Sequence, residues 1–444
     1  MRGREVFRLE LASAPLRVAF CCEFSLKMTL LIVSAPFEMH HIGASAPVHK
    51  VLFGFARSDT ISAVKIVLDI RRISDFGVGT YLRNVVRTLG RLDHENEYLL
   101  IGAIEQVSSI GALPENFRLQ QFQEEVTPAR YLEFRRVVKH FGADLVHIPH
   151  MFWRPLPVSC PYVMTVHDLL DYMYRAKART GLGRVLHFYL TRQVMHRASR
   201  LFAVSNFTKQ DICRLFQVPS SRIEVVYNAL DDRFRLGHST WTERQVLVER
   251  YQVNYPYLLY AGRISPHKNV VRIVEAFSAL KTELAKDGKF PDLKLIVIGD
   301  EVSKHPDIRR AVIKSGVQHD VRFLGFVPID VLRIFYDAAK VFVFPSLYEG
   351  FGLPPLEAMA HGTPVVTSNT AALPEVVNGA ALLVNPENVF EISRALYKAL
   401  TDQGLREKMK AAGQEQAFRF SWEASVRQML RVYTEVVESR AKSR

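Results

Sequence analysis

The sequence predicts an α/β protein made of two tandem domains, each built on a mostly parallel sheet. Short β-branched runs alternate with helix-length segments, and this pattern is typical of βαβ units. The alternation stops at a polar stretch near residues 231–250 and then starts again. The length of 444 residues is about three times that of a typical domain, which also favours more than one. Two such domains place a cleft between the carboxyl ends of their strands, where open sheets bind ligands.

Residues 1–63 show neither a sustained hydrophobic period nor helix caps, so we expect a poorly ordered extension or upstream sequence from a wrongly chosen start. The alternative is a secretory signal. It is disfavoured because the apolar run begins only at Met28, follows Glu5, Glu10 and Glu23, and lacks a convincing cleavage site.

The first domain is predicted over residues 64–235. An apolar run at 65–70 is followed by a glycine turn at 75–80 and by a helix with one apolar face, formed by Tyr81, Leu82, Val85, Val86, Leu89 and Leu92. Further strands are expected at 97–102, 144–148, 162–166, 200–204 and 223–227. Together they predict one parallel sheet.

The second domain is predicted over residues 236–420. Its strands are expected at 257–262, 293–299, 321–325, 341–344, 364–367 and 381–384. A helix starting near Trp422 would then occupy residues 421–444.

Composition narrows the class of protein. Apolar residues at 48% and charged residues at 23% are near the averages for globular proteins and argue against wholesale disorder. The cysteines form neither a metal-ligand spacing nor a disulfide framework, which favours a reducing, cytoplasmic location; they are Cys21, Cys22, Cys160 and Cys213. No run approaches the ~18 apolar residues of a membrane-spanning helix. The net charge of +13 suggests a polyanionic partner such as nucleic acid, an anionic membrane or a phosphorylated substrate.

The most informative stretch is 344–364. A buried strand is predicted to end near Phe344, and a glycine loop then leads into a short helix with prolines in its first turn. Backbone N–H groups at such a helix start suit an anionic phosphate. Glu349 and Glu357 flank this loop, and their carboxylates accept hydrogen bonds from hydroxyls. The pattern suits a ribose and a hexose joined by a diphosphate.

This run resembles the signature of glycosyltransferase family 4, in which two glutamates are separated by seven residues. The resemblance extends over about residues 64–440 and implies the two-domain GT-B fold and retaining sugar transfer. It implies donor contacts from Gly350, Phe351, Gly352 and Glu357. The segment 261–269 resembles the one whose cations clamp the donor diphosphate, here Arg263 and Lys268, and Val327 is the expected backbone contact to the nucleobase. The final helix is expected to cross back to the first domain.

In the first domain, residues 165–169 resemble the family segment whose histidine approaches the donor sugar, which assigns His167, with Glu349, to the catalytic centre. Residues 75–82 resemble the glycine loop that approaches the donor phosphates and the acceptor, through Gly77 and Gly79. Without the third glycine of a dinucleotide fingerprint, a dehydrogenase is disfavoured. We expect Arg263 and Glu357 to lie at an exposed cleft.

The resemblance implies a metal-independent reaction with a nucleotide-diphosphate sugar as co-substrate and no cofactor. The sequence contains no Asp-x-Asp pair, and cations with helix dipoles can hold a diphosphate instead. The implied route is front-face attack by the acceptor hydroxyl, assisted by the leaving phosphate. Mannose is favoured by a resemblance of the contexts of Leu68-Asp69 and residues 167–169 to mannosyl-transferring members.

The implied product is a surface polysaccharide, built on a glycan or lipid-linked acceptor; the nucleobase, acceptor and linkage stay open. One alternative is a sugar-nucleotide epimerase on a similar fold. The glutamate pair and the two cations favour transfer. A nucleic-acid-binding protein is a second alternative, but aromatic residues interleaved with basic ones on a recognisable module are missing.

Residues 172–210 contain no Asp or Glu but eight cations: Arg175, Lys177, Arg179, Arg184, Arg192, Arg197, Arg200 and Lys209. Between them lie apolar residues for one face of a helix: Leu182, Val185, Leu186, Phe188, Tyr189, Leu190, Val194 and Met195. We expect this segment to face an anionic membrane, at the inner face, or a lipid-diphosphate acceptor. The alternative is that the apolar face packs into the first domain.

Overall fold

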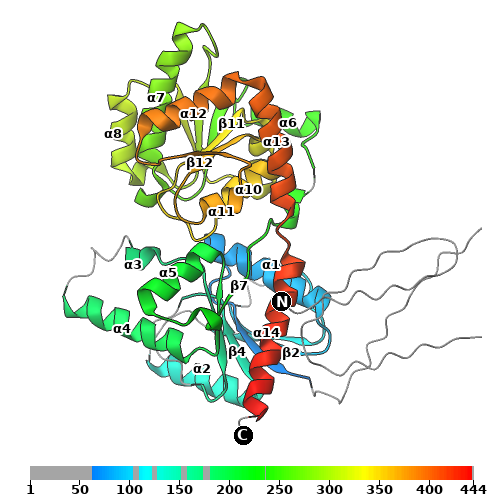
Figure 1. The fold of residues 1–444 in the computed structure, drawn as a ribbon. Coiled ribbons are helices and arrows are strands. Elements are labelled where there is room, and N and C mark those ends of the chain that lie inside the picture. The colour runs from blue at the N-terminus through cyan, green and yellow to red at the C-terminus, as the bar shows by residue number, and fades with distance from the viewer. Residues whose placement is uncertain are drawn as a thin grey trace, which may run out of the picture. The chain divides into compact units, whose positions relative to one another are not determined.

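The computed structural model describes residues 63–103, 110–122, 128–151, 158–173, 181–235 and 237–442. Within these ranges the chain forms two sheets flanked by helices (Figure 1). Every strand pair described in them is parallel. The predicted fold class is therefore confirmed. The predicted extension, residues 1–63, lies outside the described residues except for Ala63.

The first sheet and its helices are called the first lobe. Its described strands run in the order β3-β2-β1-β4-β5-β6-β7. They are β1 (Lys65–Asp69), β2 (Glu97–Gly102), β3 (Phe117–Gln121), β4 (Leu145–Ile148), β5 (Tyr162–Val166), β6 (Arg200–Ala203) and β7 (Ile223–Val225). The helices are α1 (Phe76–Leu92), α2 (Pro128–Phe141), α3 (Leu170–Met173), α4 (Leu182–Arg197), α5 (Asn206–Phe216) and α14 (Trp422–Lys442), with 3-10 turns η3 (Ser220–Arg222) and η4 (Asp232–Arg235).

The second sheet and its helices are called the second lobe. Its strand order is β10-β9-β8-β11-β12-β13. The strands are β8 (Tyr257–Ala261), β9 (Lys294–Ile298), β10 (Val321–Gly325), β11 (Val341–Phe344), β12 (Val365–Ser368) and β13 (Leu382–Val384). The helices are α6 (Trp241–Glu249), α7 (Val270–Lys286), α8 (Pro306–Lys314), α9 (Ile329–Ala338), α10 (Leu353–Ala360), α11 (Leu373–Val377), α12 (Val389–Thr401) and α13 (Gln403–Phe418), with η5 (Pro266–Lys268) and η6 (Val302–Lys304).

Burial explains which strands the sequence reveals. All residues of β4, β5 and β11 are buried, because helices cover both faces of a parallel sheet, and such strands read as continuous apolar runs. Strand β3 lies at the edge of its sheet and is exposed at four of its five residues, so its polar sequence gave no prediction. Helix α6 falls within the stretch predicted to be merely polar, and a capping box between Thr240 and Glu243 starts it.

The strand orders place two switch points. In the first sheet the chain runs outward from β1 to β3 and then returns to β4 on the other side of β1. In the second sheet it runs from β8 to β10 and returns to β11. Loops that leave such neighbouring strands in opposite directions open a crevice at the carboxyl ends, which is where α/β sheets bind ligands. The loops after β1, β4, β8 and β11 are therefore the place to look for a site.

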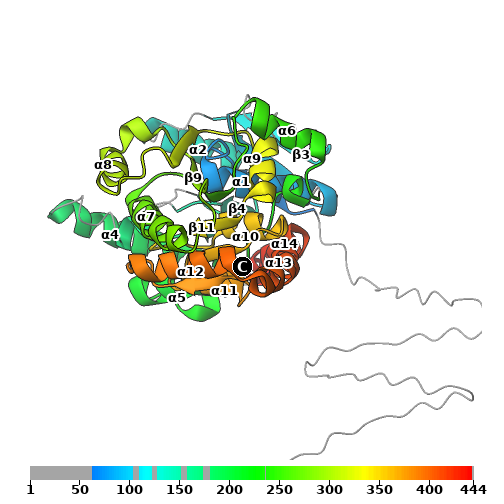
Figure 2. The same ribbon diagram turned by 90° about the horizontal axis from the view of Figure 1, so that it is seen from above.

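Helix α14 packs into the core of the first lobe although it follows the second lobe in sequence. Trp422, Met429 and Tyr433 are buried with residues of α1 and the first sheet, and the Tyr433 hydroxyl lies 2.7 Å from His147 Nδ1. In the second lobe, α12 lies along α7 and α13 along α10 (Figure 2). None of the helices described is both long enough and apolar enough to cross a bilayer.

Candidate active site

The loops after β8 and β11 meet at the switch point of the second sheet. Backbone and side-chain bonds tie them together: Leu347 N and Ser346 Oγ donate to the His267 carbonyl oxygen at 2.7 and 3.0 Å. Asn269 is buried, and its Nδ2 donates to the Pro345 carbonyl oxygen at 3.0 Å. The two loops therefore form one rigid unit that carries Arg263, Lys268 and Glu349.

Lys268 and Glu349 form an ion pair. Lys268 Nζ lies 2.6 Å from Glu349 Oε1, and the side chains are only 16% and 13% exposed. The same ammonium lies 5.1 Å from the centre of the Phe344 ring, which adds a cation–π contact. Arg263, by contrast, is 64% exposed in its side chain, with Nε 3.8 Å from Asp300 Oδ2. Two cations and a carboxylate thus line the edge of this loop unit. Lys268 is held by its ion pair with Glu349, whereas Arg263 is mostly exposed to solvent.

Gly350 makes a close backbone contact between the lobes. A Cβ built there would lie 1.7 Å from the His167 carbonyl oxygen and 3.0 Å from Asp168 Cβ. The Gly350 carbonyl oxygen accepts hydrogen bonds from Ser205 Oγ at 2.7 Å and Thr208 Oγ1 at 3.1 Å. Only glycine allows this close approach of two backbones. The loop carrying Glu349 therefore rests directly on the segment carrying His167.

Gly352 is the N-cap of α10 and has a φ of +128°, and a Cβ there would lie 2.7 Å from Leu373 Cδ2. Pro354 and Pro355 occupy the first turn, as predicted, where their missing N–H groups cost nothing. The Phe351 ring is buried against Tyr227 and Phe420.

Glu357 lies in α10 and is half-buried. Tyr336, on α9, donates its hydroxyl to Glu357 Oε2 at 2.9 Å. Burial raises the pKa of Glu357 to about 7, with a further increase from the charge of Asp231, while Tyr336 and Arg233 act in the opposite direction. The carboxyl group is therefore poised between its neutral and ionised forms near neutral pH.

His167 follows β5 and is held in one tautomer. Its Nε2 lies 2.8 Å from the carbonyl oxygen of Pro149, and because a carbonyl only accepts, Nε2 carries the proton. Its Nδ1 is left as a hydrogen-bond acceptor. Burial lowers the pKa of His167 to about 4, outweighing the bond to Pro149, so the ring is neutral near pH 7. The Tyr81 ring meets it edge-on, with centroids 4.7 Å apart.

The predicted glycine turn of the first lobe is instead the first turn of α1, which begins at Phe76. Gly77 is exposed, and a Cβ added there would meet nothing within 4 Å, whereas a Cβ at Gly79 would lie 2.3 Å from the Ile73 carbonyl oxygen. Gly79 is thus needed for packing, and Gly77 is the glycine that leaves the backbone accessible. Val327 follows β10, and it is buried.

Sequence reasoning missed several residues that shape this site. Tyr336, Asn269 and Phe344 contact or hold the predicted residues through bonds between separate helices and loops, and their own contexts look like ordinary core. Within the described ranges, no group of three or more His, Cys, Asp or Glu side chains could hold a metal ion.

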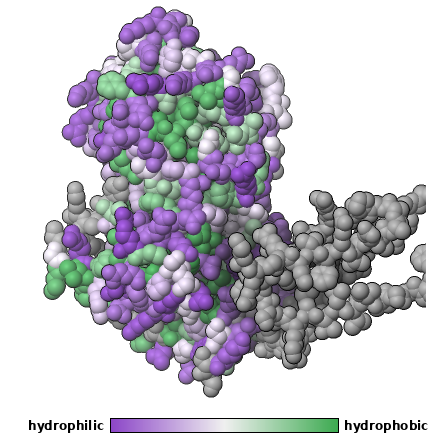
Figure 3. Space-filling model, in the orientation of Figure 1, coloured by the Kyte–Doolittle hydropathy of each residue, from purple (hydrophilic) through white to green (hydrophobic). Residues whose placement is uncertain are grey.

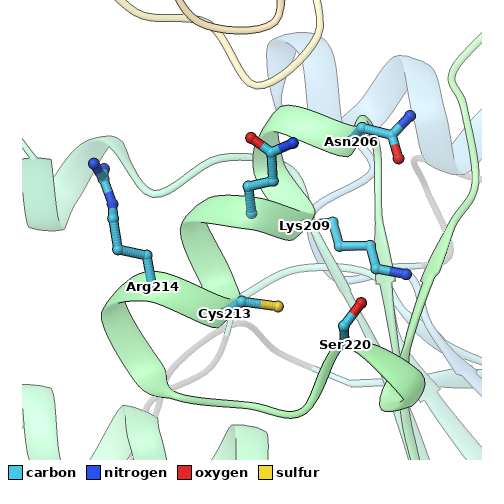
Figure 4. A pocket seen from close by; sticks show the side chains of 6 residues that line it. Asn206, Lys209, Cys213, Arg214 and Ser220 are labelled. Carbon is cyan, nitrogen blue, oxygen red and sulfur yellow. The ribbon is translucent and has the colours of Figure 1, made fainter.

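A hollow of about 550 Å³ lies elsewhere, between α5 and η3 of the first lobe (Figure 4). Lys209 and Cys213 point toward Ser220, while Arg214 points away from Lys209. Arg214 is also paired with Asp211 at 2.8 Å. Its cations therefore do not converge on a common point, and the hollow offers no second anion site.

Comparison with known proteins identifies the family of the chain. The model of glycosyl transferases group 1 matches residues 243–416, and that of glycosyltransferase family 4 matches residues 77–234. O-antigen chain mannosyltransferase B of Escherichia coli is 33% identical over 293 residues, which are 65% of this chain and 72% of that protein. The serotype-specific mannosyltransferase WbdA of Escherichia coli is 30% identical over 62% of this chain, and the matched part is 34% of WbdA.

Among solved structures, HepE of Anabaena in complex with UDP-glucose matches with a TM-score of 0.66 over 84% of this chain and 99% of HepE. The sequence identity is 17%, so this likeness concerns the fold. The family models and the mannosyltransferase relative indicate the same family, and the two parallel sheets have the fold of that family. The chain belongs to glycosyltransferase family 4, has its GT-B fold, and is a glycosyltransferase.

Proposed function

We propose that the protein is a retaining hexosyltransferase that moves mannose from a nucleotide-diphosphate sugar to a glycan or lipid-linked acceptor in polysaccharide biosynthesis. The observation that carries the proposal is the contact of Gly350 with His167, because it brings the Lys268–Glu349 pair of one lobe to the histidine of the other. The choice of mannose is supported by the O-antigen mannosyltransferase relative.

The donor would lie along the second lobe. Arg263, Lys268 and the N-terminus of α10 supply positive charge for the diphosphate and stabilise it as a leaving group, without a divalent metal. Glu357 would accept hydrogen bonds from the ribose hydroxyls, and the backbone near Val327 would contact the nucleobase. This arrangement follows from charge: cations meet the phosphates, and carboxylates meet the hydroxyls.

The sugar would lie between the lobes. Glu349, oriented by Lys268, accepts a hydrogen bond from one sugar hydroxyl, and Nδ1 of neutral His167 accepts one from another. The acceptor oxygen attacks the anomeric carbon on the face from which the diphosphate leaves. Its proton passes to the departing phosphate oxygen, so neither side chain has to form a covalent bond.

The test is turnover of a panel of nucleotide sugars, with mannose or glucose linked to GDP or UDP. One donor should be consumed and yield a nucleoside diphosphate, and Arg263→Ala should lower kcat/KM for it about 100-fold or more, since a group that stabilises leaving-group charge is lost. Arg309→Ala, a change of an exposed arginine on α8, is the matched control. Normal turnover by Arg263→Ala would contradict the site.

We also propose that the first lobe docks on an anionic membrane through α4. The apolar residues of this helix differ in burial: Val194 and Met195 are buried in the core, Phe188 and Leu190 are half-buried, and four are exposed. The exposed set, called the α4 stripe, is Leu182, Val185, Leu186 and Tyr189, which are 84%, 62%, 55% and 53% exposed. Figure 3 shows a hydrophobic patch in this region of the first lobe.

The spacing of the α4 stripe puts its members on one helix face, and Arg184 and Arg197 are exposed on the same helix. The alternative, in which the apolar face packs into the first domain, describes the second half of α4 but not the first. Arg175, Lys177 and Arg179 lie outside the described residues. Apolar side chains beside cations suit the boundary between acyl chains and anionic headgroups, where each cation adds about 1 kcal/mol.

Vesicle co-sedimentation tests this membrane contact. The protein should bind vesicles containing anionic lipid, bind less as salt rises, and lose at least about five-fold in binding when Leu182 and Val185 are both changed to serine. Ile313→Ser, at an apolar residue 70% exposed on α8, is the control and should bind normally. Equal binding to neutral and anionic vesicles, or binding to neither, would refute it.

A further inference from the structure

A carboxylate of the second lobe binds the start of a helix of the first lobe. Glu375, on α11, accepts from the backbone N–H of Asn206 at 2.9 Å through Oε1 and from that of Phe207 at 3.1 Å through Oε2. Oε1 also accepts from Asn206 Nδ2 at 2.9 Å and from the Tyr227 hydroxyl at 2.8 Å. Four donors of one lobe thus converge on one side chain of the other.

The bonds complete the N-terminus of α5. A helix leaves its first four backbone N–H groups without partners inside the helix. Its own cap, Ser205, supplies an acceptor for one of them, because its Oγ accepts from the N–H of Thr208. The Ser205 carbonyl oxygen accepts the first bond of the helix, from the N–H of Lys209. Glu375 supplies acceptors for two more of them, those of Asn206 and Phe207. Two N–H groups at the start of α5 therefore have their acceptor in the second lobe.

The same helix also holds the loop that carries Glu349. Ser205 and Thr208 donate to the Gly350 carbonyl oxygen, and Tyr348 donates its hydroxyl to Asp211 Oδ2 at 2.9 Å. Residues on both sides of Glu349 are thereby fixed to α5. Because α5 is seated against α11 through Glu375, the distance between Glu349 and His167 depends on that carboxylate.

We propose that Glu375 is a positioning residue for sugar transfer: by bonding the N-terminus of α5, it sets the register between the Glu349 loop and His167. The proposal rests on the function proposed above. Glu375 does not touch the Arg263, Lys268 and Glu357 groups assigned to the nucleotide, so its loss should leave nucleotide binding intact. It should reduce turnover, since a shift of about 1 Å in reacting groups can cost about 100-fold in rate.

Steady-state kinetics of the full chain test the proposal with Glu375→Ala and Glu375→Gln. We expect kcat at saturating donor to fall about 10- to 100-fold in Glu375→Ala, with donor KM and nucleoside-diphosphate affinity within about three-fold of the parent. The kcat of Glu375→Gln, which keeps one acceptor oxygen, should lie between the kcat of the parent and that of Glu375→Ala. Glu391→Ala is the matched control. Glu391, on α12, also accepts a bond from a backbone N–H, that of Asn385 at 2.9 Å, but both residues belong to the second lobe.

Hydrogen exchange of the backbone N–H groups of residues 206–208 is a measurement that does not depend on turnover. We expect it to be faster in Glu375→Ala than in the parent. An active parent with normal kcat in Glu375→Ala, or an equal kcat loss in Glu391→Ala, would overturn the proposal. A parent inactive with every donor would instead overturn the proposed function, while the exchange arm still reports on the contact. If Glu375→Ala does not fold, Tyr227→Phe, which removes one of the four bonds, should show a smaller kcat loss of the same kind.

Discussion

An alanine at Gly350 is expected to lower kcat at least about 100-fold while both lobes stay folded. Its Cβ would lie 1.7 Å from the His167 carbonyl oxygen and 2.8 Å from the His167 carbonyl carbon, and these backbone atoms cannot rotate away. The Glu349 loop must therefore move off His167 by more than 1 Å, given that real Cβ contacts need about 3 Å or more. Such a shift separates the two groups that the proposed reaction needs together.

Nucleotide affinity distinguishes a change in the distance between Glu349 and His167 from a loss of donor binding. Arg263, Lys268 and Glu357 all belong to the second lobe, so nucleoside-diphosphate affinity, measured by calorimetry, should stay within about three-fold of the parent while kcat falls. Gly404→Ala is the control, because a Cβ at this α13 glycine meets only Asp402 Oδ1 at 3.6 Å. Near-normal turnover by Gly350→Ala would show that the contact between the lobes does not set the active geometry.

The sequence was sufficient to predict the strands that are buried on both faces. Strands such as β5 and β11 are buried on both faces, and their apolar runs stand out from the polar segments around them. The edge strand β3 could not be found this way, since four of its residues face solvent. The start of α1 was placed too late because glycine is a poor helix former, whereas here Gly79 is required by the nearby Ile73 carbonyl.

Local sequence could indicate the candidate site but not its internal bonds. Glu349, Gly350 and Gly352 are neighbours in one run, so their pattern is visible as a unit. The bond of Lys268 to Glu349 spans 81 residues, and that of Glu375 to Asn206 spans 169. Partners so distant are set by how the sheets and lobes pack, for which a single sequence holds no local signal.

Replacing Glu357 by glutamine is expected to stabilise the protein and to impair transfer. The carboxyl pKa is 4.5 in an unfolded chain and about 7 in the fold, because burial disfavours its charge. The unfolded state therefore releases its proton first, so this group lowers the free energy of unfolding as pH rises from about 4.5 to about 7. At higher pH the cost levels off at about 3 kcal/mol.

Glu357→Gln lacks that cost, so its melting temperature should exceed the parent's by several degrees at pH 8 and by little or nothing at pH 4.5. Its kcat/KM should fall about 10- to 100-fold at pH 8, where the parent's ionised carboxylate accepts from the ribose hydroxyls. Below pH 6 the parent's own carboxyl is protonated and the gap should narrow. Thermal unfolding and kinetics at both ends of this range provide the measurement. A variant with unchanged stability at pH 8 would show that Glu357 is not held near neutrality, and one with unchanged kcat/KM would remove it from the donor site.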